Sequence, residues 1–241
     1  MTILERTVDA GDVREWFDET YRRQGLSYLR PPEAYRVLVD VLRPRPSERL
    51  LDVGCGPGHL LREAAAYGLA LAGADLSPVA VELGKKLVPE ADIREADATR
   101  LPFPDQSFDY VTCIGTLERI PNPERAILEQ IRVAKPSARF CFLVRNADTL
   151  TWRILMEGLE LRNVVGHQGA SSKDDWCRLF ERCGLTVERI LPDQWPLMWR
   201  ERAMRRLGLS PSFTRLRRGL RPLRFAGEFI FLLRHTRHAH G

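Results

Sequence analysis

The stretch that most constrains the fold runs from Leu50 to Leu61 and reads LLDVGCGPGHLL. A short apolar run ends in Asp52, three closely spaced glycines follow, and a helical pattern begins. This order predicts a strand, a tight turn and a helix N-terminus, where α/β proteins hold nucleoside-bearing ligands. In the G-x-G-x-x-G motif of dinucleotide-binding sites, the third glycine would stand at the position of His59. Here the third glycine is Gly58, one residue earlier. The carboxylate of Asp52 suits an ammonium group better than a pyrophosphate, so we expect a cationic ligand.

Short apolar runs alternate with helical patterns along the chain, which indicates a mostly parallel sheet. The runs predict strands near 49–53, 69–74, 92–95, 108–114, 138–145 and 185–191. The helical patterns predict helices near 58–67, 77–88, 122–134 and 173–183. Ser77 followed by Pro78 is typical of a capped helix start, and Gly184 is typical of a helix end.

Further motifs follow the glycine turn in order: GADLS at 73–77, DA at 97–98, LPF at 101–103, SFD at 107–109 and AKP at 134–136. With the turn, they resemble class I S-adenosylmethionine-dependent methyltransferases, in particular the small-molecule (type 11, UbiE-like) group, over residues 45–145. The resemblance implies a Rossmann-like α/β fold with a seven-stranded, mostly parallel sheet in the order 3-2-1-4-5-7-6. Helices would cover both faces, and the last strand would be antiparallel.

The same resemblance implies that the whole chain, 1–241, is a single methyltransferase domain. Residues 1–44 form an N-terminal helical lid over the cofactor, and 45–145 form the cofactor-binding core. Two insertions, 146–172 and 195–224, lie on the substrate side. The short apolar and aromatic stretch 227–236 is typical of a buried strand and would be the final, seventh one.

The implied cofactor is S-adenosyl-L-methionine, with S-adenosyl-L-homocysteine as product. Asp52 would sit near its ammonium group, and Asp75, about 20 residues after the turn, would accept both ribose hydroxyls. The other expected cofactor residues are Tyr21, Gly54, Cys55, Gly56, Gly58, Leu76, Ser77, Asp97, Ala98, Ile114 and Thr116. Two alternatives stay open here: Asp92 or Glu95 instead of Asp97 beside the adenine, and a helix cap as the role of Thr116.

Methyl transfer needs a general base only if the acceptor must lose a proton before it attacks. The candidates are His167, Glu118 and Tyr28, with His59 a remote fourth. Relatives often carry a histidine at the position of Arg119, which here places a fixed cation by the acceptor. The expected acceptor pocket contains Arg119, Trp152 and Trp199.

The net charge of +5 is unevenly distributed. Residues 195–241 contain eleven arginines and two acids, so all the excess positive charge lies in the last fifth of the sequence. Aliphatic residues alternate with these arginines in 195–224, a basic amphipathic pattern. It fits a solvated helix face, an anionic or lipid-like substrate, peripheral contact with an anionic membrane, or RNA.

Other function classes lack their motifs. Five cysteines without C-x-x-C spacing predict reduced thiols in the cytoplasm, with neither a disulfide framework nor a zinc site. Asn122-Pro123-Glu124 departs from the motif of base amino-methyltransferases, which disfavours DNA as a substrate, and no acidic cluster suggests a metal.

We therefore expect an enzyme that moves the methyl group of S-adenosylmethionine to oxygen, nitrogen or carbon of a small organic acceptor. One alternative is an RNA methyltransferase that uses the basic insertion for phosphate contacts. The other is a non-catalytic member of the fold that binds the cofactor.

Overall fold

The computed structural model describes residues 9–28, 30, 32–149, 170–193, 223 and 226–236. Its helices are α1 (Ala10–Gln24), α2 (Pro32–Asp40), α3 (His59–Ala65), α4 (Pro78–Leu87), α5 (Pro123–Val133) and α6 (Lys173–Arg182), with short 3-10 turns η1 (Gly25–Tyr28) and η2 (Leu117–Arg119). Its strands are β1 (Arg49–Val53), β2 (Ala70–Asp75), β3 (Asp92–Glu95), β4 (Phe108–Ile114), β5 (Ala134–Arg145), β6 (Leu185–Pro192) and β7 (Glu228–His235). Every strand expected from the sequence is present.

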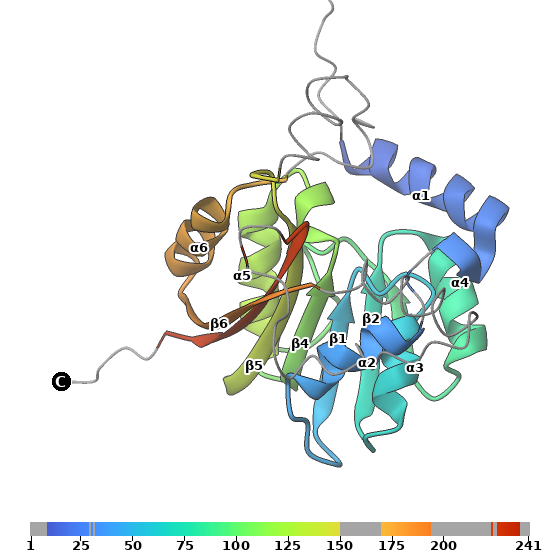
Figure 1. The fold of residues 1–241 in the computed structure, drawn as a ribbon. Helices are drawn as coiled ribbons and strands as arrows, with labels where there is room; N and C mark the ends of the chain where they lie inside the picture. The colour runs from blue at the N-terminus through green and yellow to red at the C-terminus, as the bar shows by residue number, and fades with distance from the viewer. Residues whose placement is uncertain are drawn as a thin grey trace, which may run out of the picture.

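One seven-stranded sheet organises these elements in the order β3-β2-β1-β4-β5-β7-β6 (Figure 1). Strands β1 to β5 pair in parallel, and β7 lies antiparallel between β5 and β6. The expected order and the antiparallel last strand are therefore confirmed. Because β1 to β4 run in parallel, their carboxyl ends meet at one edge of the sheet.

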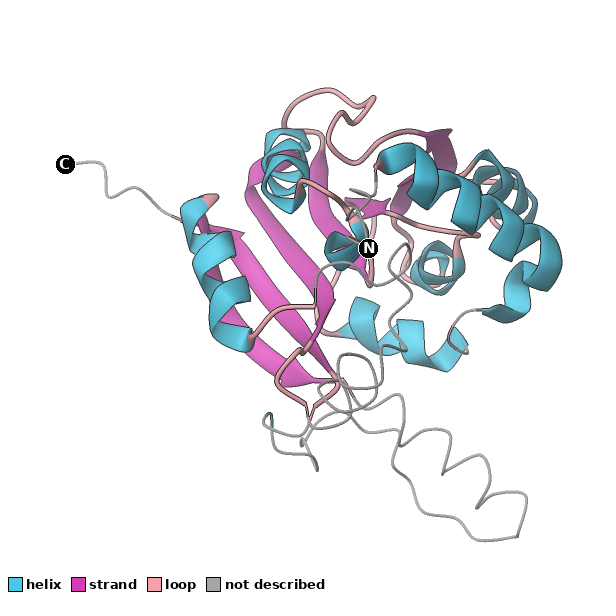
Figure 2. Ribbon diagram, turned by 90° about the horizontal axis from the view of Figure 1, so that it is seen from above, coloured by secondary structure: helices cyan, strands magenta, loops and turns pink. Residues whose placement is uncertain are grey.

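Helices cover both faces of the sheet (Figure 2). On one face, α2, α3 and α4 contribute to an apolar cluster with β1 and β2 that includes Leu38, Leu61 and Val81. On the other face, α5 and α6 pack Ile127, Trp176 and Phe180 against the sheet. The central strands β1, β2, β4, β5 and β7 are mostly buried, whereas the edge strands β3 and β6 are largely exposed or half-buried.

The boundary between α5 and β5 differs from the expectation. The sequence pattern placed the helix end at 134 and the strand start near 138, whereas α5 ends at Val133 and β5 begins at Ala134. Ala134 pairs with Phe108, and an irregularity in the β4–β5 register follows it. Lys135 then pairs with Asp109, at 2.7 Å between Nζ and Oδ1. This long-range pairing extends the strand through Pro136, which local propensity places in a turn.

The expected helix start at Ser77 is confirmed. Ser77 Oγ accepts a hydrogen bond from the backbone N–H of Ala80 at 3.1 Å, and Pro78 is the first helical residue. Gly184 follows α6 with a positive φ of 86°, as its predicted role as a helix stop requires. All five cysteines are free thiols.

Within the described part of the chain, no helix has the length and hydropathy needed to cross a membrane. The same residues contain no group of three or more histidine, cysteine or acidic side chains arranged to hold a metal ion.

Candidate functional site

The glycine turn joins β1 to α3 at the carboxyl edge of the sheet. The backbone N–H groups of Gly54 and Cys55 both donate to the carbonyl of Ala74 at the end of β2, at 2.7 and 3.1 Å. Gly54 has a φ of +71°, and a Cβ atom there would lie 2.3 Å from Thr116 Oγ1. Gly54 is therefore required both by its backbone conformation and by the close approach of Thr116.

Asp75 ends β2 and is tied to the turn by two hydrogen bonds. Its Oδ2 accepts from the backbone N–H of Gly56 at 2.7 Å, and its Oδ1 accepts from the N–H of Ser77 at 2.9 Å. Burial raises the pKa of Asp75 to about 6, although these hydrogen bonds act to lower it. The carboxylate is thereby held rigidly between the turn and the start of α4.

Asp52 lies in β1, directly before the turn, and is buried. Its Oδ1 accepts a hydrogen bond from Thr112 Oγ1 at 2.7 Å, across the β1–β4 pairing. Burial raises the pKa of Asp52 to about 7. The hydrogen bond from Thr112 acts to lower this pKa, and the nearby charge of Asp75 acts to raise it. A buried carboxylate with one hydroxyl partner and a second acid nearby favours a cation as its missing partner.

Helix α1 packs on the same edge from the side of α4 (Figure 1). Ser77 Oγ donates a short hydrogen bond to Asp18 Oδ1 in α1, and both residues are buried. Arg14, also in α1, pairs with Glu95 at the end of β3, with 2.9 Å between the charged atoms. Tyr21 is buried in the same helix, and its pKa is raised by burial and by the nearby charge of Asp75. The N-terminal segment thus contacts the residues expected to hold adenosine.

The remaining expected cofactor residues also lie at this edge. Asp97 follows β3, and its Oδ1 accepts from both the backbone N–H and the hydroxyl of Thr99 at 2.8 Å. Thr116 caps no helix with its side chain; its Oγ1 lies 3.4 Å from the carbonyls of Gly54 and Ile114. Leu76, Ala98 and Ile114 are half-buried.

Glu118 stands apart because it is a buried acid whose oxygens lack hydrogen bonds. It belongs to η2, just after β4, and neither Oε1 nor Oε2 has a hydrogen-bond partner among the described residues. Arg145 forms an ion pair with Glu118, with 3.7 Å between its Nε and Glu118 Oε1. Burial raises the pKa of Glu118, although Arg119 and Arg145 act to lower it.

Arg119 is oriented by the N-terminal helix. Its guanidinium carbon lies 5.1 Å from the ring centroid of Phe17 in α1. Its Nε is buried and makes no hydrogen bond within the described structure. Consecutive side chains of η2 therefore carry buried polar atoms that a bound molecule could satisfy.

His59, the remote base candidate, is held between α3 and the N-terminal segment. One ring nitrogen lies 3.1 Å from the carbonyl oxygen of Leu26, and the ring stacks on Tyr35. Burial lowers its pKa. The other expected residues Trp152, His167 and Trp199, and the side chain of Tyr28, lie outside the described residues, as do most of the two insertions.

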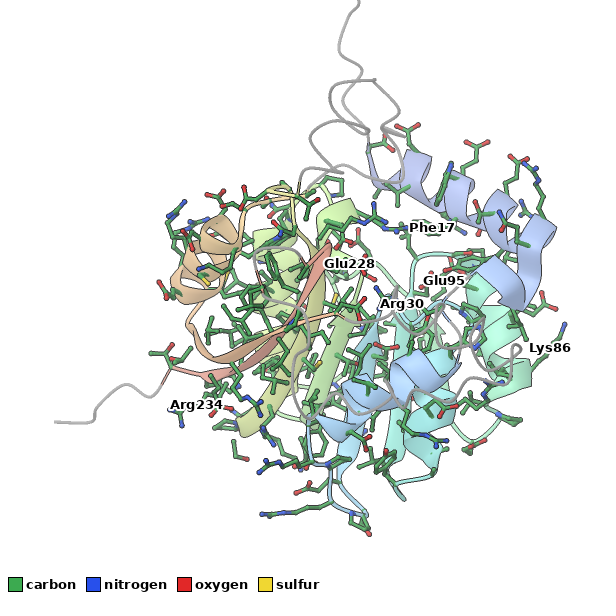
Figure 3. The ribbon with its side chains drawn as sticks, viewed as in Figure 1. Phe17, Arg30, Lys86, Glu95, Glu228 and Arg234 are labelled. Atoms are coloured by element: carbon green, nitrogen blue, oxygen red, sulfur yellow. The ribbon has the colours of Figure 1, made fainter. Side chains whose placement is uncertain are left out.

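Several side chains of this site were not predicted from the sequence. Asp18 joins α1 to Ser77, and Arg30 binds Asp193 after β6 and Glu228 in β7 (Figure 3). These partners are separated by between 59 and 198 residues along the chain. The only local signal is the position of Asp18 in an amphipathic helix, which does not identify its partner.

The residues at this edge fit S-adenosylmethionine. Asp52 offers a buried negative charge suited to the ammonium, and Asp75 is an acceptor for the ribose hydroxyls fixed by two backbone N–H groups. The turn leads into α3, whose N-terminal N–H groups suit a carboxylate. A seven-stranded Rossmann-like sheet with this strand order and these acids at its carboxyl edge is the arrangement expected of a class I methyltransferase.

Comparisons with known proteins agree. Residues 51–142 match a family model described as a methyltransferase domain. A demethylmenaquinone methyltransferase of Beutenbergia cavernae is 34% identical over 149 residues, which cover 60% of this chain and 61% of that protein. A ubiquinone biosynthesis O-methyltransferase of Saccharophagus degradans is 27% identical over 79% of this chain and 91% of its own length. Residues 51–142 therefore resemble a methyltransferase domain, and the chain is similar to the UbiE-like demethylmenaquinone methyltransferases over the aligned part.

The fold of this chain also resembles that of a solved methyltransferase structure. The geranyl diphosphate C-methyltransferase of Streptomyces coelicolor superposes with a TM-score of 0.66 at 14% identity, over 95% of this chain and 97% of that one. S-adenosyl-L-methionine is the cofactor of the family, and that structure contains S-adenosyl-L-homocysteine. The chain spans about half the length of the first curated relatives that it matches, between 44% and 62%.

Proposed function

We propose that this chain transfers the methyl group of S-adenosylmethionine to a small organic acceptor that presents an ionisable hydroxyl group to Glu118. The observation that carries the proposal is the pair of Glu118 oxygens, which are buried beside the carboxyl end of β4 and accept no hydrogen bond from the described residues. A buried acid of this kind is costly unless a ligand supplies its partner.

Gly115 lies beside Glu118. It has a positive φ of 65°, and among the described residues a Cβ atom placed there would come within 4 Å of Glu118 Oε1 alone, at 3.9 Å. Phe17 and Arg119 stack nearby and offer flat apolar and cationic surfaces. These features favour a hydroxylated aromatic acceptor. The curated relatives support this class, since they are named for demethylmenaquinone and for ubiquinone biosynthesis.

In this mechanism Asp52 and Asp75 hold the cofactor, which when bound supplies an electrophilic methyl carbon on a positively charged sulfur. Glu118 in its carboxylate form takes the hydroxyl proton. Loss of this proton would make the oxygen or an activated ring carbon of the acceptor nucleophilic. That atom would then take the methyl group of the bound cofactor, and the electrons of the carbon–sulfur bond would stay on sulfur. Because burial raises its pKa, the Glu118 carboxylate is a stronger base than an ordinary carboxylate.

The test uses the full chain with methyl-labelled S-adenosylmethionine and three acceptor pools. These are reduced 1,4-naphthoquinones and simple phenols, total cellular RNA, and buffer alone. We expect label in the hydroxylated aromatics. Label in RNA alone would support the alternative of an RNA methyltransferase, and cofactor binding without turnover in any pool would support a non-catalytic role.

The variant Glu118→Gln tests whether Glu118 acts as the general base. Loss of a general base lowers turnover by about 10²-fold or more, while cofactor affinity should stay unchanged. Glu129→Gln is the matched control, because Glu129 is a buried glutamate in α5 that binds Arg132 away from the acceptor side. Full turnover in Glu118→Gln would show that the acceptor needs no base at this position.

A further inference from the structure

Buried charges of alternating sign connect the N-terminal segment to the acceptor side. Arg30 binds Asp193, at 2.9 Å, and Glu228. Glu228 Oε1 lies 3.7 Å from Arg145 Nε, which in turn lies 3.7 Å from Glu118 Oε1. Each of these five side chains is less than a quarter exposed. The last residue of this series of charges is Glu118, the proposed general base.

Arg30 joins elements that are far apart in sequence. It lies between η1 and α2, whereas Asp193 directly follows β6 and Glu228 begins β7. Glu228 and Asp193 are already adjacent, since the N–H of Asp193 donates to the carbonyl of Glu228 at 3.0 Å. A guanidinium that binds both carboxylates fixes the ends of these two strands against the N-terminal segment. In Figure 3, Arg30 and Glu228 lie toward the same edge of the sheet as Phe17.

The same N-terminal segment contacts the cofactor side. Asp18 accepts the hydrogen bond of Ser77, whose backbone N–H binds Asp75. Fewer than two turns of α1, from Asp18 to Gln24, and the 3-10 turn η1 lie between Asp18 and the segment that carries Arg30, a path short enough for a shift of α1 to reach Arg30. Residues 9–30 thus touch both the expected ribose site and the charges that lead to Glu118.

We propose that Arg30 is a positioning residue that couples cofactor occupancy to the arrangement of Asp193, Glu228 and Arg145 around Glu118. The proposal rests on the proposed function. A bound cofactor fixes α1 through Ser77 and Asp75, and Arg30 then holds the ends of β6 and β7 in the arrangement that orients Glu118. Coupling of this kind is reciprocal, so the charge series also favours cofactor binding.

Hydrogen exchange on the full chain, with and without S-adenosylhomocysteine, tests this coupling. In the wild type we expect the ligand to slow exchange at 52–60 and 75–80, and also at 190–193 and 226–229, by about fivefold or more. In Arg30→Met the first two regions should keep their protection and the last two should lose it. Arg30→Lys, which retains the charge, should restore part of it.

Arg36→Met is the matched control, because Arg36 lies near Arg30 in the sequence, in α2, but pairs with Glu63 in α3. It should behave as the wild type. If Arg30→Met does not fold, the triple variant Arg30→Met, Asp193→Asn, Glu228→Gln removes the charges together and leaves none of the three unpaired. Ligand-induced protection at 226–229 that persists without Arg30 overturns the proposal. Absence of ligand binding by the wild type would instead refute the proposed function.

Discussion

Cofactor binding should depend on pH through Asp52. The ammonium group of the cofactor pairs with the ionised carboxylate, and the pKa of Asp52 in the free protein is raised to about 7 by burial. An ordinary aspartate is fully ionised above pH 5.5 and would give no such dependence. Affinity should therefore fall between pH 7 and pH 5.5, where the ammonium keeps its proton.

The size of the effect follows from the ionised fraction. With a pKa of about 7, Asp52 is about half ionised at pH 7 and about 3% ionised at pH 5.5, which weakens binding about 16-fold. This equals about 1.6 kcal/mol. Asp75, whose pKa is about 6, can add at most a further factor of about 4.

Isothermal titration calorimetry with S-adenosylhomocysteine measures the dissociation constant across this range. The informative variant is Asp52→Asn, which keeps a side-chain oxygen for Thr112 but cannot ionise. Its affinity at pH 7 should be lower, and its remaining pH dependence should not exceed the factor of about 4 from Asp75. Equal pH dependence in the wild type and in Asp52→Asn would refute the assignment of the cation site to Asp52.

The same variant gives an independent check on the free protein. The folded-state pKa of Asp52 lies above the usual aspartate value, so its ionisation destabilises the fold as the pH rises from about 4 to about 7. Without ligand, Asp52→Asn should therefore be at least as stable as the wild type at pH 8. A large loss of thermal stability there would indicate a structural role for the carboxylate.

Three further outcomes are expected. Asp75→Ala should weaken S-adenosylhomocysteine binding by roughly 10- to 100-fold in calorimetry, because the ribose hydroxyls and the Gly56 N–H lose their acceptor; unchanged affinity would contradict its role. Gly54→Ala should destabilise the fold by about 2 kcal/mol or more in denaturant titrations, since the new methyl group overlaps Thr116 at a positive φ. Thr116→Gly should recover part of that loss. Replacing the arginines at 200–206 by glutamine should leave cofactor affinity intact and impair methylation of the acceptor; a joint loss of both would make that segment structural.

The sequence alone predicted the sheet and the cofactor edge because their signals are local. Apolar runs mark strands, and a strand followed by a glycine turn and a helix places Asp52 and Asp75 at adjacent strand ends. Parallel pairing then brings these ends together, as the register of β1 with β2 shows. The place of the antiparallel β7 came from the family resemblance, since nothing local distinguishes it from other buried strands.

Tertiary structure decided what lies around that edge. Thr116 packs against Gly54 and Asp18 binds Ser77, so residues about 60 positions apart fix the turn and the N-terminal helix. Arg30 meets its two carboxylates across more than 160 residues. The sequence gives no signal of which charged residues will pair when they lie so far apart along the chain.

Glu118 shows the difference most clearly. Its sequence position after β4 made it a candidate base, but only the packing of η2 shows that both of its oxygens are buried and accept no hydrogen bond from the described residues. The sequence therefore indicated the strands and the glycine turn with its two acids, and the family resemblance supplied the strand order. The folded structure decided which acid is desolvated, because burial and pKa depend on neighbours that are assembled from every part of the chain.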